Sequence, residues 1–213
     1  RIACETMLQR ALAGGAAPPV LLREAIEQAN ATILEKAGRE ADLAGMGTTV
    51  TALLLADGRV YLAHVGDSRL YILRDRRLHC LSRDHTLVAE MVRRGVLSHA
   101  DARVHPDRNV IYKAVGTAAE LEPTVYERGL PVRPGDRLLL CSDGLTDLVT
   151  DDVIARELWQ HDPPDACRAL VQRALDAGGH DNITVGAFRV VEAAASELRP
   201  APDTRVPATG RAA

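Results

Sequence analysis

The chain has 213 residues, of which 46% are hydrophobic and 26% charged, a composition typical of a globular domain and not of a disordered chain. Its formal net charge of −3 offers no broad basic face, which argues against nucleic acid or an anionic membrane as the main partner. Because no apolar run reaches the ~18 residues of a membrane span, we expect a cytoplasmic protein.

The cysteines, histidines and serines give no sign of a disulfide framework, a zinc site or a serine nucleophile. No Cys-x-x-Cys pair, His-x-x-x-His spacing or Gly-x-Ser-x-Gly motif occurs. We therefore interpret the scattered cysteines as small buried hydrophobic side chains in a protein of a reducing compartment. They are Cys4, Cys80, Cys141 and Cys167.

Two amphipathic helices are predicted at the start of the chain. The first has apolar residues at helical spacing and ends at Gly14-Gly15; they are Cys4, Met7, Leu8, Ala11 and Leu12. The second runs from about residue 20 to 36 and has a similar stripe, with Gly38 just past its end. Each helix is expected to bury one face.

From Gly47 the pattern changes to that of antiparallel strands. The β-branched, apolar stretch "TTVTALLLA" is followed by Asp57-Gly58, a strong hairpin signal, and by the returning strand "RVYLAHVG". The stretches "SRLYILR" and "LHCLS", joined by the polar "DRR", predict a second hairpin. Consecutive hairpins indicate an antiparallel meander.

The second half of the chain alternates strands with helices. We predict a helix over 86–94, an irregular loop over 95–109, strands over 122–130 and 136–142, helices beginning at Thr150 and Asp162, and a closing strand over 182–191. Residues 193–213 have no apolar period and are interpreted as a disordered tail or linker. The predicted fold class is α+β, a four-layer α-β-β-α sandwich of two antiparallel sheets with flanking helices, over residues 1–192.

Asp143 and Asp181 stand at strand ends beside glycines, where a ligand can approach closely. If their strands are neighbours, the two carboxylates converge and either share a proton or bind a cation. Oxygen ligands without His or Cys favour magnesium or manganese over zinc. The alternative is that both acids make Asx-turns at loop entrances.

Two further acids have simpler explanations that remain open. Asp67, in "HVGDSR", could lie in a plain turn between strands, and Arg69 could be a solvated surface charge. Asp84, in "SRDHTLV", could cap the following helix, because Asp is a favoured N-cap residue. Asp151 and Asp152 fit the first turn of a helix, where the macrodipole favours negative charge.

Taken together and in order, five blocks resemble the metal-dependent protein phosphatases, the type 2C serine/threonine phosphatases, in their bacterial form. They cover about Gly45 to Val190 and read "GMGTTVTALLLADGRVYLAHVGDSRLYILRD", "LSRDHTLVAEMVRRG", "HPDRNVIYKAVGT", "LLLCSDGLTDLVTDDVI" and "GGHDNITV". The resemblance implies a binuclear Mn²⁺ or Mg²⁺ centre between the two sheets and a metal-bound water as the nucleophile, with no catalytic side chain beyond it.

The resemblance also implies roles for single residues. Asp143 and Asp181 correspond to direct metal ligands, and Asp84 is similar to an acid that helps to hold a third, weaker metal. Asp67 and Arg69 match a family signature that we interpret as structural support. Residues 95–109 correspond to the flap beside the active site, and this name is kept below.

The implied activity is hydrolysis of phosphoserine and phosphothreonine in proteins that a serine/threonine kinase phosphorylates, by a monomer. One departure qualifies it: the family's N-terminal block, with a phosphate-gripping Arg and further acids, does not occur here. The "GMG" at 45–47 precedes a strand without an acid and does not replace that block. The chain is therefore expected to be N-terminally incomplete, and the alternative function is a catalytically impaired binding or regulatory module on the phosphatase fold.

Overall fold

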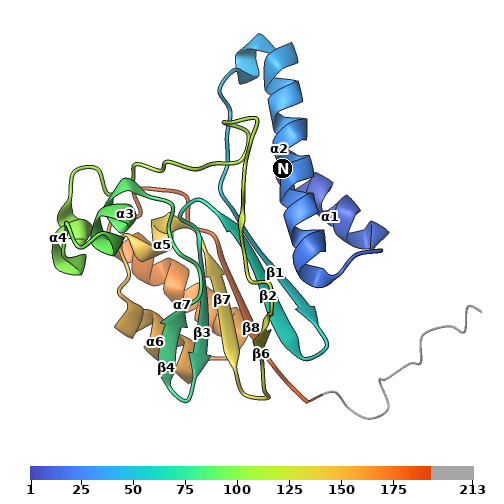
Figure 1. The fold of residues 1–213 in the computed structure, drawn as a ribbon. Coiled ribbons are helices and arrows are strands. Elements are labelled where there is room, and N and C mark those ends of the chain that lie inside the picture. Colours follow the sequence, from blue (N-terminus) through green and yellow to red (C-terminus); the bar gives the residue numbers. More distant parts are fainter. Residues whose placement is uncertain (193–213) are drawn as a thin grey trace, which may run out of the picture.

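The computed structural model describes residues 1–192 (Figure 1), so the predicted disordered tail over 193–213 lies outside the described residues. The elements are α1 (Ile2–Ala13), α2 (Pro18–Arg39), the 3-10 turn η1 (Ala41–Leu43), β1 (Val50–Ala56), β2 (Arg59–Val65), β3 (Arg69–Arg74), β4 (Arg77–Cys80), α3 (Leu87–Arg93), α4 (His99–Val104), β5 (Thr124–Val125), β6 (Leu130–Pro131), β7 (Arg137–Cys141), α5 (Asp143–Thr146), α6 (Asp151–Gln160), α7 (Pro163–Asp176) and β8 (Val185–Arg189).

Two antiparallel sheets form the centre of the molecule. The first has the order β1-β2-β5, with β6 also paired to β2, and the second has the order β4-β3-β7-β8. The Asp57-Gly58 hairpin joins β1 to β2 as predicted, and both residues have the positive φ angles, 50° and 68°, that this two-residue turn requires. No helix of residues 1–192 is long and apolar enough to cross a membrane.

The period-2 alternation of the strands separates three apolar layers. Val60 and Leu62 of β2 pack against residues of β3 and β7 between the two sheets, whereas Ala63 and Val65 face α2. Residues of β3 and β7 on the opposite face contact α6 and α7. Figure 1 shows α1 and α2 outside the first sheet and α6 and α7 outside the second. The predicted four-layer α-β-β-α class is confirmed.

The predicted apolar face of the first helix is wrong. In α1 the buried residues are Ala3 and Thr6, while Cys4 is exposed and Leu8 and Leu12 are 60% and 78% exposed. The helix packs mainly against α2, so only the side of α1 that faces α2 is covered. Helical spacing identifies an apolar stripe, but the partner element decides which part of it is buried.

The cysteine prediction is also wrong for most positions. Cys141 is buried in β7, but Cys4 and Cys80 are exposed and Cys167 is only partly buried. Cysteine is small enough for surface positions, so its average preference for burial does not place each residue.

The segment between α3 and β5 differs from the predicted irregular loop because it contains α4. Ser98 caps this helix by accepting a hydrogen bond from the Asp101 N–H at 3.1 Å. The N-cap of α3 is Thr86, which accepts from the Ala89 N–H, so the interpretation of Asp84 as a cap is wrong. Backbone bonds from Leu87 to Val110 and from Tyr112 to His85 fasten the far end of the flap to the start of α3.

Candidate functional site

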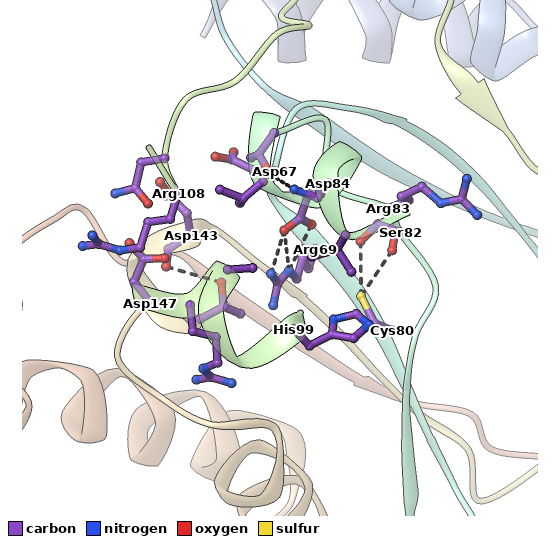
Figure 2. Close-up of a pocket in the computed structure, with 18 of the residues that line it drawn as sticks. Asp67, Arg69, Cys80, Ser82, Arg83, Asp84, His99, Arg108, Asp143 and Asp147 are labelled. Atoms are coloured by element: carbon purple, nitrogen blue, oxygen red, sulfur yellow. Dashed lines mark hydrogen bonds and ion pairs between the residues drawn. The ribbon is translucent and has the colours of Figure 1, made fainter. Parts of the chain in front are cut away.

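A pocket of about 700 Å³ lies between the flap, α3 and the loops that leave β2 and β7 (Figure 2). The pocket is lined by carboxylates from the end of the sheets and by residues of α3 and the flap. The acids are Asp67, Asp84, Asp143, Asp147 and Asp151, and the flap contributes His99, Ala102, Arg103, Arg108 and Asn109.

Asp143 follows the last residue of β7 and opens the short helix α5. Its Oδ1 accepts a hydrogen bond from the Gly144 N–H at 2.9 Å. Burial raises the pKa of Asp143, and the negative charges of Asp181 and Asp147 raise it further. The carboxylate at this strand end therefore lies among like charges.

Asp181 lies near Asp143 because β8 is the neighbour of β7, and its charge acts on Asp143, but Asp181 is exposed and is not one of the residues that line the pocket. The pairing continues past the strands: the Ser142 N–H donates to the Thr184 carbonyl at 3.0 Å, and the Ser142 hydroxyl donates to the Asn182 carbonyl at 3.0 Å. A Cβ at Gly144 would lie 2.5 Å from the Asn182 oxygen, so only glycine permits this approach of the two loops. The neighbouring strands on which the predicted convergence depends are present.

Asp67 is a further acid of the pocket, although the sequence predicted a turn or a structural support at this position. Burial raises its pKa to about 6, and the charges of Asp143 and Asp84 act in the same direction. The preceding Gly66, with a φ of 107°, is tight against Thr49 and fixes the loop between β2 and β3. A glycine directly before an acid at a strand end is the signal that could have identified Asp67; Asp181 has its glycines two and three residues earlier.

Asp84 differs from the other acids because a cation of the chain already compensates it. Both of its carboxylate oxygens accept hydrogen bonds from Arg69, at 3.0 and 3.1 Å from Nε and 2.6 Å from Nη2. Arg69 also donates to the Tyr71 hydroxyl at 3.0 Å, which in turn donates to Asp151 at 3.2 Å. Arg69 therefore holds Asp84 and Tyr71 in place through hydrogen bonds and is not a solvated surface charge.

His85 fastens the Asp67 loop to the segment that holds β5. Its backbone N–H donates to the Gly66 carbonyl at 2.7 Å, and its ring Nδ1 accepts from the Gly66 N–H at 3.0 Å. Since Nδ1 accepts, the proton lies on Nε2, which donates to the Thr124 hydroxyl at 3.1 Å. Burial lowers the pKa of His85 to about 4, with further lowering by His64 and Lys113, so the ring is neutral at pH 7.

Two acids of the pocket, Asp67 and Asp143, and the nearby Asp181 fit a hard divalent cation by their chemistry. Asp67, Asp143 and Asp181 supply only oxygen donors, and none of the three forms an ion pair within residues 1–192. The raised pKa of Asp67 and of Asp143 reflects crowded negative charge that a cation would relieve. Within the same residues, no group of three or more His, Cys, Asp or Glu side chains is already gathered tightly enough to hold a metal ion.

Comparison with known proteins identifies a family and several relatives of this chain. The family model described as Protein phosphatase 2C matches residues 1–176. The serine/threonine protein phosphatase PstP of Mycobacterium tuberculosis is 42% identical over 171 residues, which are 80% of this chain and 33% of that protein. A serine/threonine phosphatase of Listeria monocytogenes is 39% identical over 165 residues, 77% of this chain and 65% of that protein. The chain thus spans less than two thirds of the length of either relative.

Solved structures show the same fold. A crystal structure of Mycobacterium tuberculosis PstP/Ppp matches with a TM-score of 0.82 and 36% identity, covering 90% of this chain and 82% of that one. The catalytic domain of PstP in complex with two manganese ions matches with a TM-score of 0.79 and 36% identity, covering 90% of this chain and 81% of that one.

Proposed function

Because the chain belongs to the protein phosphatase 2C family, we propose that it is a metal-dependent serine/threonine protein phosphatase. The proposed reaction is hydrolysis of phosphoserine and phosphothreonine in proteins. The observation that carries the proposal is that Asp143 lines the pocket at the end of β7 and feels the charge of Asp181, which precedes the neighbouring strand β8. These are the two acids whose resemblance to metal ligands is strongest in the sequence.

The proposed cofactor is Mn²⁺ or Mg²⁺, in two sites with a possible third, weaker one, and the manganese complex of PstP supports this choice. Asp143 and Asp181 would hold it. For a further ligand we propose Asp67 ahead of Asp84, because the charge of Asp84 is already balanced by Arg69. A bound divalent cation supplies a Lewis acid that lowers the pKa of water and offsets charge on the phosphoryl oxygens.

The residues of the chain itself position the reacting groups. The Arg69–Asp84 pair and the His85 contacts hold the Asp67 loop against the end of β3. Residues of the flap and α3 line the same pocket and would shield a bound phosphate from water. In the metal-free protein the raised pKa of Asp67 means that this acid binds a proton below about pH 6.

The proposed partners are phosphorylated proteins that a serine/threonine kinase modifies, in the cytoplasm, with a monomeric enzyme that binds neither nucleic acid nor membrane. The net charge of −3 supports the exclusion of polyanionic partners. The names of the relatives, which are serine/threonine phosphatases, support the substrate class.

The test is hydrolysis of para-nitrophenyl phosphate by the full chain during a Mn²⁺ titration. We expect activity that rises with Mn²⁺ and falls at least 100-fold in Asp143→Asn, since the amide carries no charge to attract the cation. Asp152→Asn is the matched control, because Asp152 is an exposed acid of α6 outside the pocket. Absence of Mn²⁺-dependent turnover in the unaltered chain would contradict the proposal and favour the binding-module alternative.

A further inference from the structure

We propose that Arg103 and Arg108 of the flap form a subsite for acidic side chains that flank the phosphorylated residue of a protein substrate. This inference rests on the proposed phosphatase function and names the substrate class of the same pocket. The subsite would give preference to phosphoproteins with Asp or Glu near the modified residue.

Both arginines lack a side-chain partner within residues 1–192, whereas most other arginines of this part of the chain have one. Neither forms an ion pair, a side-chain hydrogen bond or a ring contact with any residue that the structure describes. Within 1–192 the arginines in this condition are Arg77, Arg83, Arg103, Arg108 and Arg128, and three of them line this one pocket.

Two other pocket arginines are distinguished from this pair by their surroundings. Arg93 is bound to Glu90 of its own helix at 2.5 Å. The guanidinium of Arg83 points away from the carboxylates in Figure 2. Arg103, at the end of α4, and Arg108, five residues later, are therefore the flap cations that line the pocket with the acids and form no ion pair within residues 1–192.

The charge distribution decides what such a pair can bind. The phosphoryl group would bind beside the carboxylates, where the proposed metal cations would neutralise its charge. The cations would also balance the negative charge of the carboxylates. The flap arginines would then remain available to an anion next to the phosphorylated residue. A guanidinium matches a carboxylate with two parallel hydrogen bonds, so Asp and Glu are the fitting side chains. Because both arginines are exposed, the preference should be modest and should weaken in high salt.

The experiment compares phosphothreonine peptides that differ only in the flanking residues, which are Asp and Glu, Gln, or Lys. With Mn²⁺ and low salt, we expect kcat/KM to fall in that order, with about a 10-fold range between the acidic and the lysine peptide. The ratio should shrink toward unity in 0.5 M salt. It should fall to within about twofold in the double variant Arg103→Ala/Arg108→Ala.

Charge reversal and a matched control separate recognition from folding. In Arg103→Glu/Arg108→Glu the order should invert, with the lysine peptide preferred, an outcome that damage to the fold does not produce. Arg77→Ala removes an equally unpaired arginine of β4 outside the pocket and should keep the ratio of the unaltered chain. A ratio that stays the same in both double variants would overturn the subsite.

The two proposals fail in distinguishable ways. Absence of Mn²⁺-dependent para-nitrophenyl phosphate hydrolysis in the unaltered chain would contradict the phosphatase proposal and would leave the subsite to be tested by binding. In that case fluorescence anisotropy of labelled peptides, with Mn²⁺ present, reads the same ranking. Tighter binding of the acidic peptide that the reversal variant inverts supports the subsite, and equal or undetectable binding of all three peptides overturns it.

Discussion

Replacing Asp67 and Asp84 one at a time by Asn should have opposite effects on stability and on metal binding. Burial beside other acids raises the pKa of Asp67 from 3.8 to about 6, so its charge opposes folding at neutral pH. That difference corresponds to an upper bound of about 3 kcal/mol. Solvent screening of this half-buried side chain reduces the effect to about 1 kcal/mol.

The sign follows from the raised pKa. The protonated carboxyl is favoured in the folded state, so its contribution to stability is complete below about pH 3.8 and is lost as the pH rises through about 6. In EDTA at pH 7, Asp67→Asn should therefore increase the free energy of unfolding by about 1 kcal/mol, and the gain should disappear at pH 4. The same variant should weaken Mn²⁺ binding at least 10-fold.

Asp84→Asn should behave in the reverse way. It leaves Arg69, whose side chain is 31% exposed, without the carboxylate that accepts its hydrogen bonds, and the loss should be about 2 kcal/mol. Mn²⁺ affinity should change by less than about threefold. Urea unfolding at pH 7 and pH 4 and calorimetric Mn²⁺ titration measure both quantities. Destabilisation of the metal-free protein by Asp67→Asn, or loss of Mn²⁺ affinity at unchanged stability in Asp84→Asn, would contradict these roles of the two acids.

Three further changes test the supports of the site and of the fold. His85→Ala should lower the free energy of unfolding by about 2 kcal/mol, and His85→Asn should recover about half, because its side-chain oxygen can accept the Gly66 N–H; urea unfolding compares them. Burial opposes the charge of Asp136, but hydrogen bonds from Arg74 hold its pKa below the ordinary value, so this stabilisation is present above about pH 4 and is lost as the pH falls through the lowered pKa. Asp136→Asn should cost about 2 kcal/mol at pH 7 and flatten the acid limb of a stability-pH curve, and an unchanged curve would contradict the assignment. Gly144→Ala should cost 1–3 kcal/mol and weaken calorimetric Mn²⁺ binding by separating the two loops, unlike Gly38→Ala, where a Cβ meets no neighbour.

The layers of the fold were predictable because they depend on local patterns. The alternation in β2 places Val60 and Leu62 between the sheets, and the Asp57-Gly58 turn sets the hairpin register. The buried face of α1 was not predictable, because it depends on the angle at which α1 meets α2. The helix α4 was missed because six residues give too little periodicity to distinguish a helix from a loop.

The proposed metal-binding acids were only partly predictable, because a carboxylate's role depends on which cation the fold brings to it. Asp67 and Asp84 both stand in short polar segments near strand ends, and nothing local separates them. The pairing of β3 with β7 places Arg69 opposite Cys141, and Arg69 then bonds to Asp84 and not to Asp67. Which of the two acids is paired with Arg69 thus depends on the sheet register, and this register cannot be read from the sequence.

The same distinction between paired and unpaired charges applies to the basic residues of the pocket. A folded chain usually pairs or solvates its charges, because an uncompensated charge at a partly buried site raises the free energy of the folded state. Here Asp67 and Asp143 are crowded by like charge, while Arg103 and Arg108 line the same pocket without an ion pair within residues 1–192. Acids and arginines that line one pocket of about 700 Å³ without pairing with each other are the arrangement expected of a site whose charges are completed by a cation and an anionic substrate.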